Sequence, residues 1–396
     1  MEKSDLANKH LLIISQNYST FTKNQIESVA PYFKKVYVLP VYRPIAEISN
    51  FLPIDSLKPF RKKVKIDLSN LSENITVIPT PLNYIPLKSW YKVVGDNHLK
   101  IVKKIIQKYH IQFDMIHCHF TYSSGYVGSK LKNIYNVPLV ITGQGFDIYD
   151  LPFRDAYWSD KIGNVLKSAD KIFTVSTNNI KCIEKLGVND SVELIQNGYS
   201  EDLFFPMGKI EARKKLNLPE DKKIIVTVGN LIAIKGQKYL VDAIARLVAK
   251  HENLLCMIIG GGGLRKELKE QIKKLDLQEC VQLVGEVEHN KIHQWINACD
   301  IFVLPSLNEG NPTVLLECLA CGRPFISTDV GGVPEIIKDK RLGLLFQPGN
   351  VDDMERTINQ ALNIVWDQNY IIKYAHSFTW NEIAKKVLKA YKQLIG

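Results

Sequence analysis

The sequence predicts an α/β protein with two doubly wound parallel-sheet domains that face each other across a cleft. Short apolar runs rich in β-branched residues alternate with longer amphipathic stretches, which is the pattern of strand–helix–strand units. This alternation occurs twice, with a break around Tyr199–Lys209. The 396 residues are too many for one small core, and a composition of 45% hydrophobic and 23% charged residues is that of a globular protein.

Each half of the chain contains a series of strand candidates bounded by polar or turn residues. The first series is Leu11–Ser15, Val36–Pro40, Met115–His117, Leu139–Thr142, Lys171–Ser176 and Val192–Ile195. The second series is Ile224–Gly229, Leu254–Gly260, Val281–Val284, Ile301–Leu304, Pro324–Thr328 and Gly343–Phe346. Helical patterns lie between them, as in Gln237–Lys250, Leu264–Leu275 and Asn290–Ala298. Strands and helices in this order form parallel sheets covered on both faces.

We expect an N-terminal domain over residues 1–205, a C-terminal domain over residues 206–375 and a final helix within residues 376–396. In Thr379–Leu394 the apolar residues recur at helical spacing, which predicts a helix that docks on a core. We expect that helix to pack back towards the N-terminal domain.

The net charge of +10 is concentrated in the first part of the chain, where residues 1–150 hold 19 lysines and arginines against 11 acidic residues. The densest cluster is Lys58–Lys65. It is either a solvated basic face or a surface for an acidic partner, such as anionic lipid or a phosphorylated substrate. Nucleic acid is not expected, because no binding motif accompanies the charge.

The sequence contains neither a signal-peptide pattern at its start nor an apolar run of the roughly 20 residues that span a bilayer. We therefore expect a cytoplasmic protein that acts at the inner face of the membrane if the basic cluster meets lipid.

Two local patterns resemble metal sites. Cys318 and Cys321 form a C-x-x-C pair without a second pair nearby, and His117–His119 places two histidines on one face of a strand without an evident third ligand. Buried core residues are the better interpretation of both patterns, so we expect no metal.

The segment EGNPTVLLE places one carboxylate on each side of an apolar, helix-like run. Pro312 suits the first turn of a helix, with Asn311 as its cap. The backbone amides at the start of that helix would attract an anion, with Glu309 just before them and Glu317 about a turn and a half deeper. A buried carboxylate needs a partner, which for Glu317 is either a ligand or a group such as Arg323 or a backbone donor.

Small or polar loops follow the other strands of this half. Gly229 allows a tight exit from its strand, and Lys235 opens the next helix, where it suits a phosphate. Gly260 and Gly262 resemble a phosphate-cradling turn, but Arg265 replaces the sixth-position glycine of the dinucleotide fingerprint. A nucleoside diphosphate sugar matches these features, because it has an anionic centre flanked by a sugar and a ribose that each present hydroxyl groups.

The segment EGNPTVLLE also resembles the E-x7-E motif of the retaining glycosyltransferases of family 4, which have the GT-B fold of two Rossmann-like domains. The segments VGNLIAIKG, IIGGGGLRKEL, DIFVLPSLNEG and LACGRPFISTDVGGVPEII follow in the order of that family, and DMIHCHF, VPLVITGQGFDI and ELIQNGYSEDLFFP resemble its first half. The resemblance covers most of residues 110–350. The Asn-Pro-Thr turn is most similar to that of polysaccharide-building members.

The resemblance implies a role for each matching residue. Lys235 would contact the donor diphosphate, Glu309 the donor sugar and Glu317 the ribose, so that Glu309 and Lys235 are the catalytic candidates. The other donor-binding candidates are Gly229, Asn230, Gly260, Gly262, Gly285, Val287, Gly310, Asn311, Pro312, Thr313 and Val314. Of these, Gly285 and Val287 would lie near the base, and Val314 would cradle the nucleotide.

On the acceptor side the matching positions are Gln144, Asp147 and Asn197. The chain departs from the family pattern at Asn230, where an arginine is usual, and at Gln144, where many members have a histidine. It also lacks the usual paired glycines in Ser15–Gln25.

The hypothesis is a metal-independent, retaining glycosyltransferase that needs no cofactor. It would move a sugar from a UDP- or GDP-linked donor to a hydroxyl of a glycan, a lipid-linked or another acceptor, in the biosynthesis of a cell-surface polysaccharide or glycoconjugate. No general base is assigned. The alternatives are a nucleotide-sugar epimerase of the same fold and a non-catalytic module that binds a nucleotide sugar.

Overall fold

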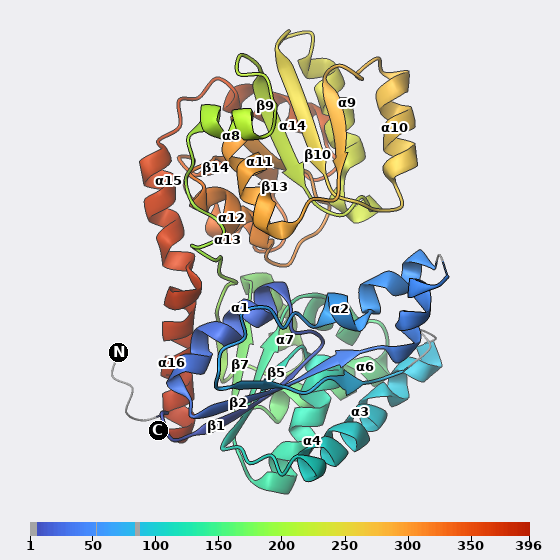
Figure 1. The fold of residues 1–396 in the computed structure, drawn as a ribbon, viewed down its shortest axis with the longest axis vertical. Helices are drawn as coiled ribbons and strands as arrows, with labels where there is room; N and C mark the ends of the chain where they lie inside the picture. The colour runs from blue at the N-terminus through green and yellow to red at the C-terminus, as the bar shows by residue number, and fades with distance from the viewer. Residues whose placement is uncertain (1–5, 53, 84–87) are drawn as a thin grey trace. The chain divides into compact units, whose positions relative to one another are not determined.

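The computed structural model describes residues 6–52, 54–83 and 88–396 (Figure 1). The chain divides into two compact units, one formed by Met1–Asn197 together with Trp380–Gly396 and the other by Gly198–Thr379. Each unit contains one sheet in which every pairing between strands is parallel. The predicted fold class, two parallel-sheet α/β domains, is therefore confirmed.

The sheet of the N-terminal unit has the strand order β3-β2-β1-β5-β6-β7-β8, with β4 also paired to β2. Its strands are β1 (His10–Ser15), β2 (Lys35–Tyr42), β3 (Ile75–Val77), β4 (Thr80–Pro81), β5 (Met115–His119), β6 (Leu139–Gly143), β7 (Lys171–Thr174) and β8 (Val192–Leu194). Its helices are α1 (Thr20–Val29), α2 (Lys62–Lys65), α3 (Lys88–Lys108), α4 (Tyr126–Tyr135), α5 (Phe146–Tyr149), α6 (Ala156–Lys167), α7 (Thr177–Lys185) and α16 (Trp380–Ile395).

The strand β1 shows why both faces of this sheet are covered. Leu11 and Ile13 belong to the apolar cluster that contains α1 and α16, whereas Leu12 and Ile14 belong to the cluster that contains α3 and α4. Successive side chains of a strand point to opposite faces, so a run of four apolar residues supplies two cores.

The C-terminal helix α16 completes the first of these cores. Ile383, Val387 and Tyr391 lie in the same cluster as Leu11, and α16 lies beside α1 in Figure 1. Tyr391 also bonds through its hydroxyl to Nδ1 of His117, at 2.5 Å.

The divisions between the units differ from the expected ones at 205 and 375. The first lies after Asn197 because Tyr199 pairs with Thr379 in an isolated β-bridge and Phe204 packs in the core of the C-terminal unit. The second division lies after Thr379, because the same β-bridge ties Thr379 to the C-terminal unit. The last helix begins at the next residue, Trp380.

The sheet of the C-terminal unit has the strand order β11-β10-β9-β12-β13-β14. Its strands are β9 (Lys223–Val228), β10 (Leu254–Ile259), β11 (Val281–Gly285), β12 (Ile301–Leu304), β13 (Phe325–Thr328) and β14 (Gly343–Phe346). Its helices are α8 (Lys209–Lys215), α9 (Gln237–Leu247), α10 (Arg265–Lys274), α11 (Ile292–Ala298), α12 (Thr313–Ala320), α13 (Val333–Ile336), α14 (Val351–Ala361) and α15 (Gln368–Ala375).

The order of these strands reverses between β9 and β12. Helices α9, α10 and α14 cover one face of the sheet, and α11, α12, α13 and α15 cover the other. A sheet wound in both directions from its centre binds ligands beyond the carboxyl ends of its strands, where the order reverses. The loops after β9 and β12 are therefore the first place to look for a site.

No helix in the described part of the chain is long and apolar enough to cross a membrane.

Candidate active site

Glycines bring the loops after β9 and β10 into backbone contact. Gly260 and Gly262 have φ of 139° and 151°, and a Cβ at either position would collide with the carbonyl oxygen of Gly229 or Leu231. The amide of Leu231 in turn donates to the carbonyl of Gly261 at 2.8 Å. The glycines therefore serve the close packing of two loops, which fixes the backbone on either side of Asn230.

Two of the predicted catalytic residues meet at this end of the sheet. Lys235 follows β9 in a short 3₁₀ turn, and its Nζ lies 2.6 Å from Oε1 of Glu309, which follows β12. The same carboxylate oxygen accepts a hydrogen bond from Ser306 Oγ at 2.6 Å. The side chain of Glu309 is 9% exposed and that of Lys235 is 25% exposed, so this ion pair is partly shielded from water.

The glycine pair after β13 holds the Glu309 loop from the other side. The amide of Gly332 donates to the carbonyl of Gly310 at 2.7 Å. Gly331 has φ of 56°, and a Cβ there would collide with the carbonyl oxygen of Glu309. A glycine is therefore needed for this close approach, and it sets the position of the backbone that carries Glu309.

The helix α12 begins one residue later than expected. Pro312 occupies the N-cap position with extended backbone angles, no side chain caps the helix, and Thr313 is the first helical residue. The prediction that Asn311 caps the helix is therefore wrong; its side chain is buried in the loop instead. The amide of Leu315 donates to the carbonyl of Pro312 at 3.1 Å, so the amides of Thr313 and Val314 are the candidates for binding a ligand.

Glu317 lies on α12 and has a protein partner that the sequence did not indicate. Its Oε1 lies 3.0 Å from Nε2 of His289, in the loop between β11 and α11. The suggested partner Arg323 instead donates to the backbone carbonyl of Asn297. The hydrogen bond to Glu317 raises the pKa of His289, although burial opposes the rise. The sequence offered one signal for this residue, because His289 follows a predicted strand as the other site candidates do.

Of the predicted base-pocket residues, Gly285 is the last residue of β11, and Val287 precedes His289 in the loop that follows. Gly285 ends β11 with φ of 97°, and its carbonyl accepts the amide of Gly260 at 2.8 Å. Val287 and Val314 both pack against the cluster of buried side chains that contains Leu315. The structure thus brings the donor-side candidates together at the carboxyl ends of neighbouring strands.

The acceptor-side candidates belong to the N-terminal unit. Asp147 is 3% exposed and accepts backbone hydrogen bonds from Gln144, Gly145 and Thr121, at 3.1, 2.9 and 2.8 Å. Burial is the largest influence on its carboxyl group and raises its pKa against the effect of these amides. Asp147 therefore holds the loop after β6 together. Beside it, Nε2 of Gln144 is buried and has no hydrogen-bond partner among the residues that the structure describes. Asn197 is a buried residue at the end of the unit.

Two family models match the chain in succession. The model for Glycosyltransferase Family 4 matches residues 62–203, and the model for Glycosyl transferases group 1 matches residues 208–378. The chain belongs to the family 4 type of glycosyltransferases.

Two named relatives of this glycosyltransferase are themselves named as sugar transferases. It is 24% identical over 344 residues to the GPI3 subunit of phosphatidylinositol N-acetylglucosaminyltransferase from Saccharomyces cerevisiae, covering 84% of this chain and 74% of that protein. It is 30% identical over 260 residues to the putative teichuronic acid biosynthesis glycosyltransferase TuaC of Bacillus subtilis, covering 65% of this chain and 64% of TuaC.

A solved structure with the same fold is that of Anabaena HepE in complex with UDP. It matches this glycosyltransferase with a TM-score of 0.74 and 19% identity, over 98% of this chain and all of HepE. At that identity the match establishes the GT-B fold.

The two metal-like patterns of this glycosyltransferase lie in its cores. Cys318 and Cys321 are buried free thiols whose pKa values burial raises, and Sγ of Cys318 donates to the carbonyl of Arg323. His117 bonds to Thr142 and Tyr391, and burial lowers the pKa of His119 to about 3. Within the described ranges, no three acidic, histidine or cysteine side chains gather as metal ligands would.

Proposed function

We propose that this glycosyltransferase moves a sugar from a nucleotide-sugar donor, with retention of configuration and without a metal ion. The observation that carries the proposal is the ion pair between Lys235 and Glu309, which lies just before the uncapped start of α12 with Glu317 further along the same helix. The arrangement provides a cation and free amides for a diphosphate, with a carboxylate on either side.

The donor diphosphate would lie against Lys235 and the first amides of α12. Breaking the bond between sugar and phosphate places growing negative charge on the leaving diphosphate. A fixed ammonium group and a helix start stabilise that charge without reorganising, which is the kind of interaction that dominates many enzymes. In the free protein Glu309 is the counter-charge of Lys235, and in the complex a phosphate group would take over that role.

The two carboxylates would hold the two sugars. Once Lys235 turns to the phosphates, Glu309 can accept hydrogen bonds from hydroxyls of the donor sugar, with Ser306 orienting the carboxylate. His289 binds Oε1 of Glu317, which leaves Oε2 to accept from the ribose. Support for a nucleotide donor also comes from HepE, which was solved with UDP.

The acceptor would be a glycan or a lipid-linked molecule that carries a phosphate. Gln16, Arg43 and Lys65 line a small cavity of about 30 Å³ in the N-terminal unit, near the ends of β1 and β2. Burial and then the charge of Arg43 lower the pKa of Lys65. Two neighbouring cations facing one cavity favour an anionic group between them.

An anionic membrane surface is the proposed location of that acceptor, through the cluster Lys58–Lys65. Only part of the cluster is free for this role, because Arg61 is bound to Ser49 and Lys65 lies over the ring of Phe60. Lys62 and Lys63 are exposed, although the Lys62 ammonium also lies 5.9 Å from the centre of the Tyr42 ring. The neighbouring segment exposes apolar side chains, including Phe51 at 89%. Exposed apolar groups next to lysines suit the interface of an anionic bilayer.

The donor site is tested by Glu309→Gln and Lys235→Met, with transfer rate and UDP or GDP affinity measured in both. Losing one charge-assisted hydrogen bond should raise the barrier to transfer by about 2–3 kcal/mol. Lys235→Met should also weaken nucleotide binding. The matched controls are Lys250→Met and Glu355→Gln, which remove another ion pair of the same unit, at 3.0 Å, and should leave transfer unchanged.

Wild-type transfer rates in both site variants would refute the proposed site. Conversion of the donor to an isomeric sugar nucleotide without any acceptor would favour an epimerase, and tight binding without turnover of any donor would favour a non-catalytic module.

Membrane attachment is tested with liposomes. At low salt, vesicles that contain anionic lipid should retain the wild type and retain less of Lys62→Glu/Lys63→Glu, because the variant loses cationic charge at the surface. Equal retention by neutral vesicles would contradict an electrostatic attachment.

A further inference from the structure

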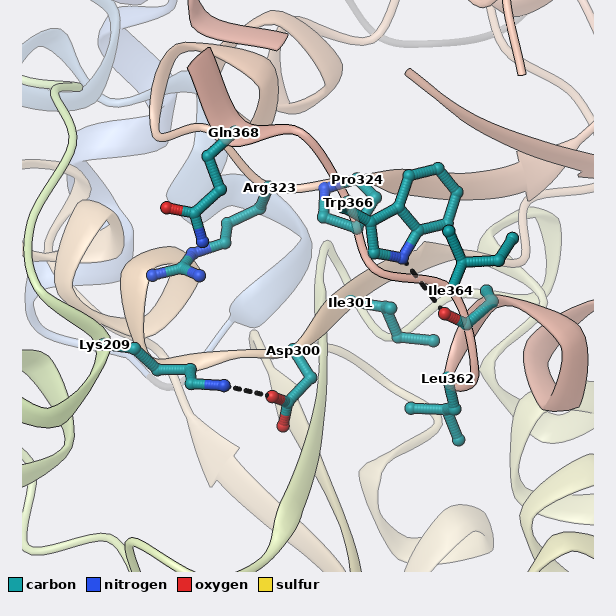
Figure 2. Close-up of a pocket in the computed structure, with 10 residues that line it drawn as sticks. Lys209, Asp300, Ile301, Arg323, Pro324, Leu362, Ile364, Trp366 and Gln368 are labelled. Carbon is teal, nitrogen blue, oxygen red and sulfur yellow. Dashed lines mark hydrogen bonds and ion pairs between the residues drawn. The ribbon is translucent and has the colours of Figure 1, made fainter. Parts of the chain in front are cut away.

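A second polar cavity lies at the amino ends of β12 and β13, which is the end of the C-terminal sheet opposite to the proposed donor site. It has a volume of about 180 Å³. Figure 2 shows Lys209, Arg323 and Gln368 on one side and Leu362, Ile364 and Trp366 on the other. The proposed donor site is at the carboxyl ends of the same strands, so a four-residue strand, about 13 Å long, separates the two.

Two buried arginines next to this cavity differ in how their hydrogen-bonding groups are used. Arg213 is 2% exposed and each of its three nitrogens has a partner, namely the carbonyls of Ala298 and Glu220 and the carboxylate of Asp300. Arg323 is 4% exposed, and among the described residues its side chain makes one hydrogen bond, from NH2 to the carbonyl of Asn297 at 2.6 Å. Its Nε is buried without a partner, and no carboxylate of the described residues lies within ion-pair distance of it.

The single acid that lines the cavity is already engaged by other cations. Asp300 binds Lys209 at 2.6 Å and Arg213 at 2.8 Å and also accepts the amide of Ile224. Burial alone would raise the pKa of Asp300, but the hydrogen bonds and charges of these groups outweigh it and lower the pKa. Two cations thus share this carboxylate, and among the described residues Arg323 has no counter-charge of its own. An unpaired buried charge is costly unless an anion neutralises it.

The shape and polarity of the cavity limit which kind of anion it can bind. A planar guanidinium with free donors matches the oxygens of a phosphate group, and a flexible lysine can add a further donor. The opposite wall is apolar and includes the indole of Trp366, whose Nε1 is bonded to the carbonyl of Ala361. A small phosphate fits the polar side, and a compact body attached to it would pack on the indole.

We propose that this cavity binds a small phosphate ligand, either inorganic phosphate or a phosphomonoester, with Arg323 as its main partner. Lys209 and Gln368 would supply additional hydrogen bonds. The site is separate from the proposed donor site and does not depend on the role assigned to Lys235 or Glu309.

The test measures binding of inorganic phosphate and of glycerol 3-phosphate by titration calorimetry, with a saturating concentration of UDP or GDP to occupy the donor site. Wild type should bind at one site per chain, and Arg323→Met should weaken binding at least tenfold. Arg356→Met is the matched control, because this exposed arginine lies on α14 of the same unit and should bind like wild type. Sodium chloride of equal ionic strength, without phosphate, should give no binding signal.

A second pair of variants keeps the test decisive if Arg323→Met does not fold. Lys209→Met removes a half-buried cation of the cavity and should weaken phosphate binding several-fold. Trp366→Phe should remove any change in tryptophan fluorescence that phosphate causes in the wild type. Tighter binding of glycerol 3-phosphate than of phosphate would identify a phosphomonoester as the ligand, and the reverse order would identify free phosphate. The proposal would be overturned if wild type did not bind phosphate at millimolar concentration. It would also be overturned if the Lys209 and Arg323 variants bound phosphate as tightly as wild type.

Discussion

The carboxyl ends of the two sheets are built from different kinds of polar group. In the C-terminal unit they present carboxylates paired with side chains, Glu309 with Lys235 and Glu317 with His289. In the N-terminal unit, the loop after β6 buries a carboxylate that is fully occupied by backbone amides. A carboxylate paired with another side chain can exchange its partner for a ligand, whereas one bound by three backbone amides cannot do so without breaking its own loop.

The largest effect should come from breaking that loop. Asp147→Ala leaves three amides of a buried loop without an acceptor, which should lower the free energy of unfolding by roughly 3 kcal/mol or more. Urea denaturation measures this loss, and Asp147→Asn, which keeps the shape and one acceptor oxygen, should lose less. A stable Asp147→Ala protein that has lost transfer would instead mean that Asp147 meets the acceptor directly.

The Glu317 carboxylate should behave in the opposite way, with an effect on binding and little on stability. Glu317→Ala should weaken UDP or GDP binding by about 2 kcal/mol, or roughly 30-fold, because the ribose loses a charged acceptor. The comparison of each nucleotide with its 2′-deoxy form sharpens the result, since the difference between the two should shrink in the variant. An undiminished preference for the ribose form would show that Glu317 does not bind it.

A smaller effect should appear in the titration of His289. Its pKa is raised in the folded protein by the hydrogen bond to Glu317, so the stability that this pair contributes is fully present below the unfolded pKa and is lost as the pH rises through the folded pKa. NMR titration should show a His289 pKa above the usual 6.5, and Glu317→Gln should lower it towards that value. An unchanged His289 pKa in the variant would refute the pairing in solution.

The smallest effect should follow removal of divalent metal ions. If Lys235 and the amides of α12 neutralise the diphosphate, EDTA should leave the transfer rate unchanged. The assay needs a metal-free donor and an added-Mg²⁺ control. A strict requirement for Mg²⁺ would show that Lys235 and the amides of α12 are not sufficient to neutralise the diphosphate.

The spacing of the apolar residues and the order of strand and helix patterns along the chain were enough to predict two parallel-sheet domains. The four apolar residues of β1 are divided between two cores, as a strand covered on both faces requires. The short strands β3 (Ile75–Val77) and β4 (Thr80–Pro81) were missed, because Pro79 and Pro81 break a segment that is already too short to show a strand pattern. The start of α12 was displaced by one residue, since Pro312 suits both the cap and the first turn.

The candidate site was predictable where it depends on chain order and not where it depends on contacts between loops. Lys235 and Glu309 each follow a strand, and neighbouring parallel strands bring their ends together. His289 could not be identified as the partner of Glu317, because its distance from α12 depends on the path of the loop between β11 and α11. Nor could Lys65, counted as part of a basic surface, be recognised as a residue that packs on Phe60.

The return of α16 to the first sheet has a consequence for biogenesis. During synthesis on the ribosome, the face of β1 that carries Leu11 and Ile13 emerges long before Ile383 and Val387, which cover it. Helix α1 covers part of this face early, but the part that α16 covers stays unshielded while the entire second unit is translated, and such exposure promotes aggregation. A nascent chain arrested before residue 380 should therefore engage chaperones, and release should follow once α16 has left the exit tunnel.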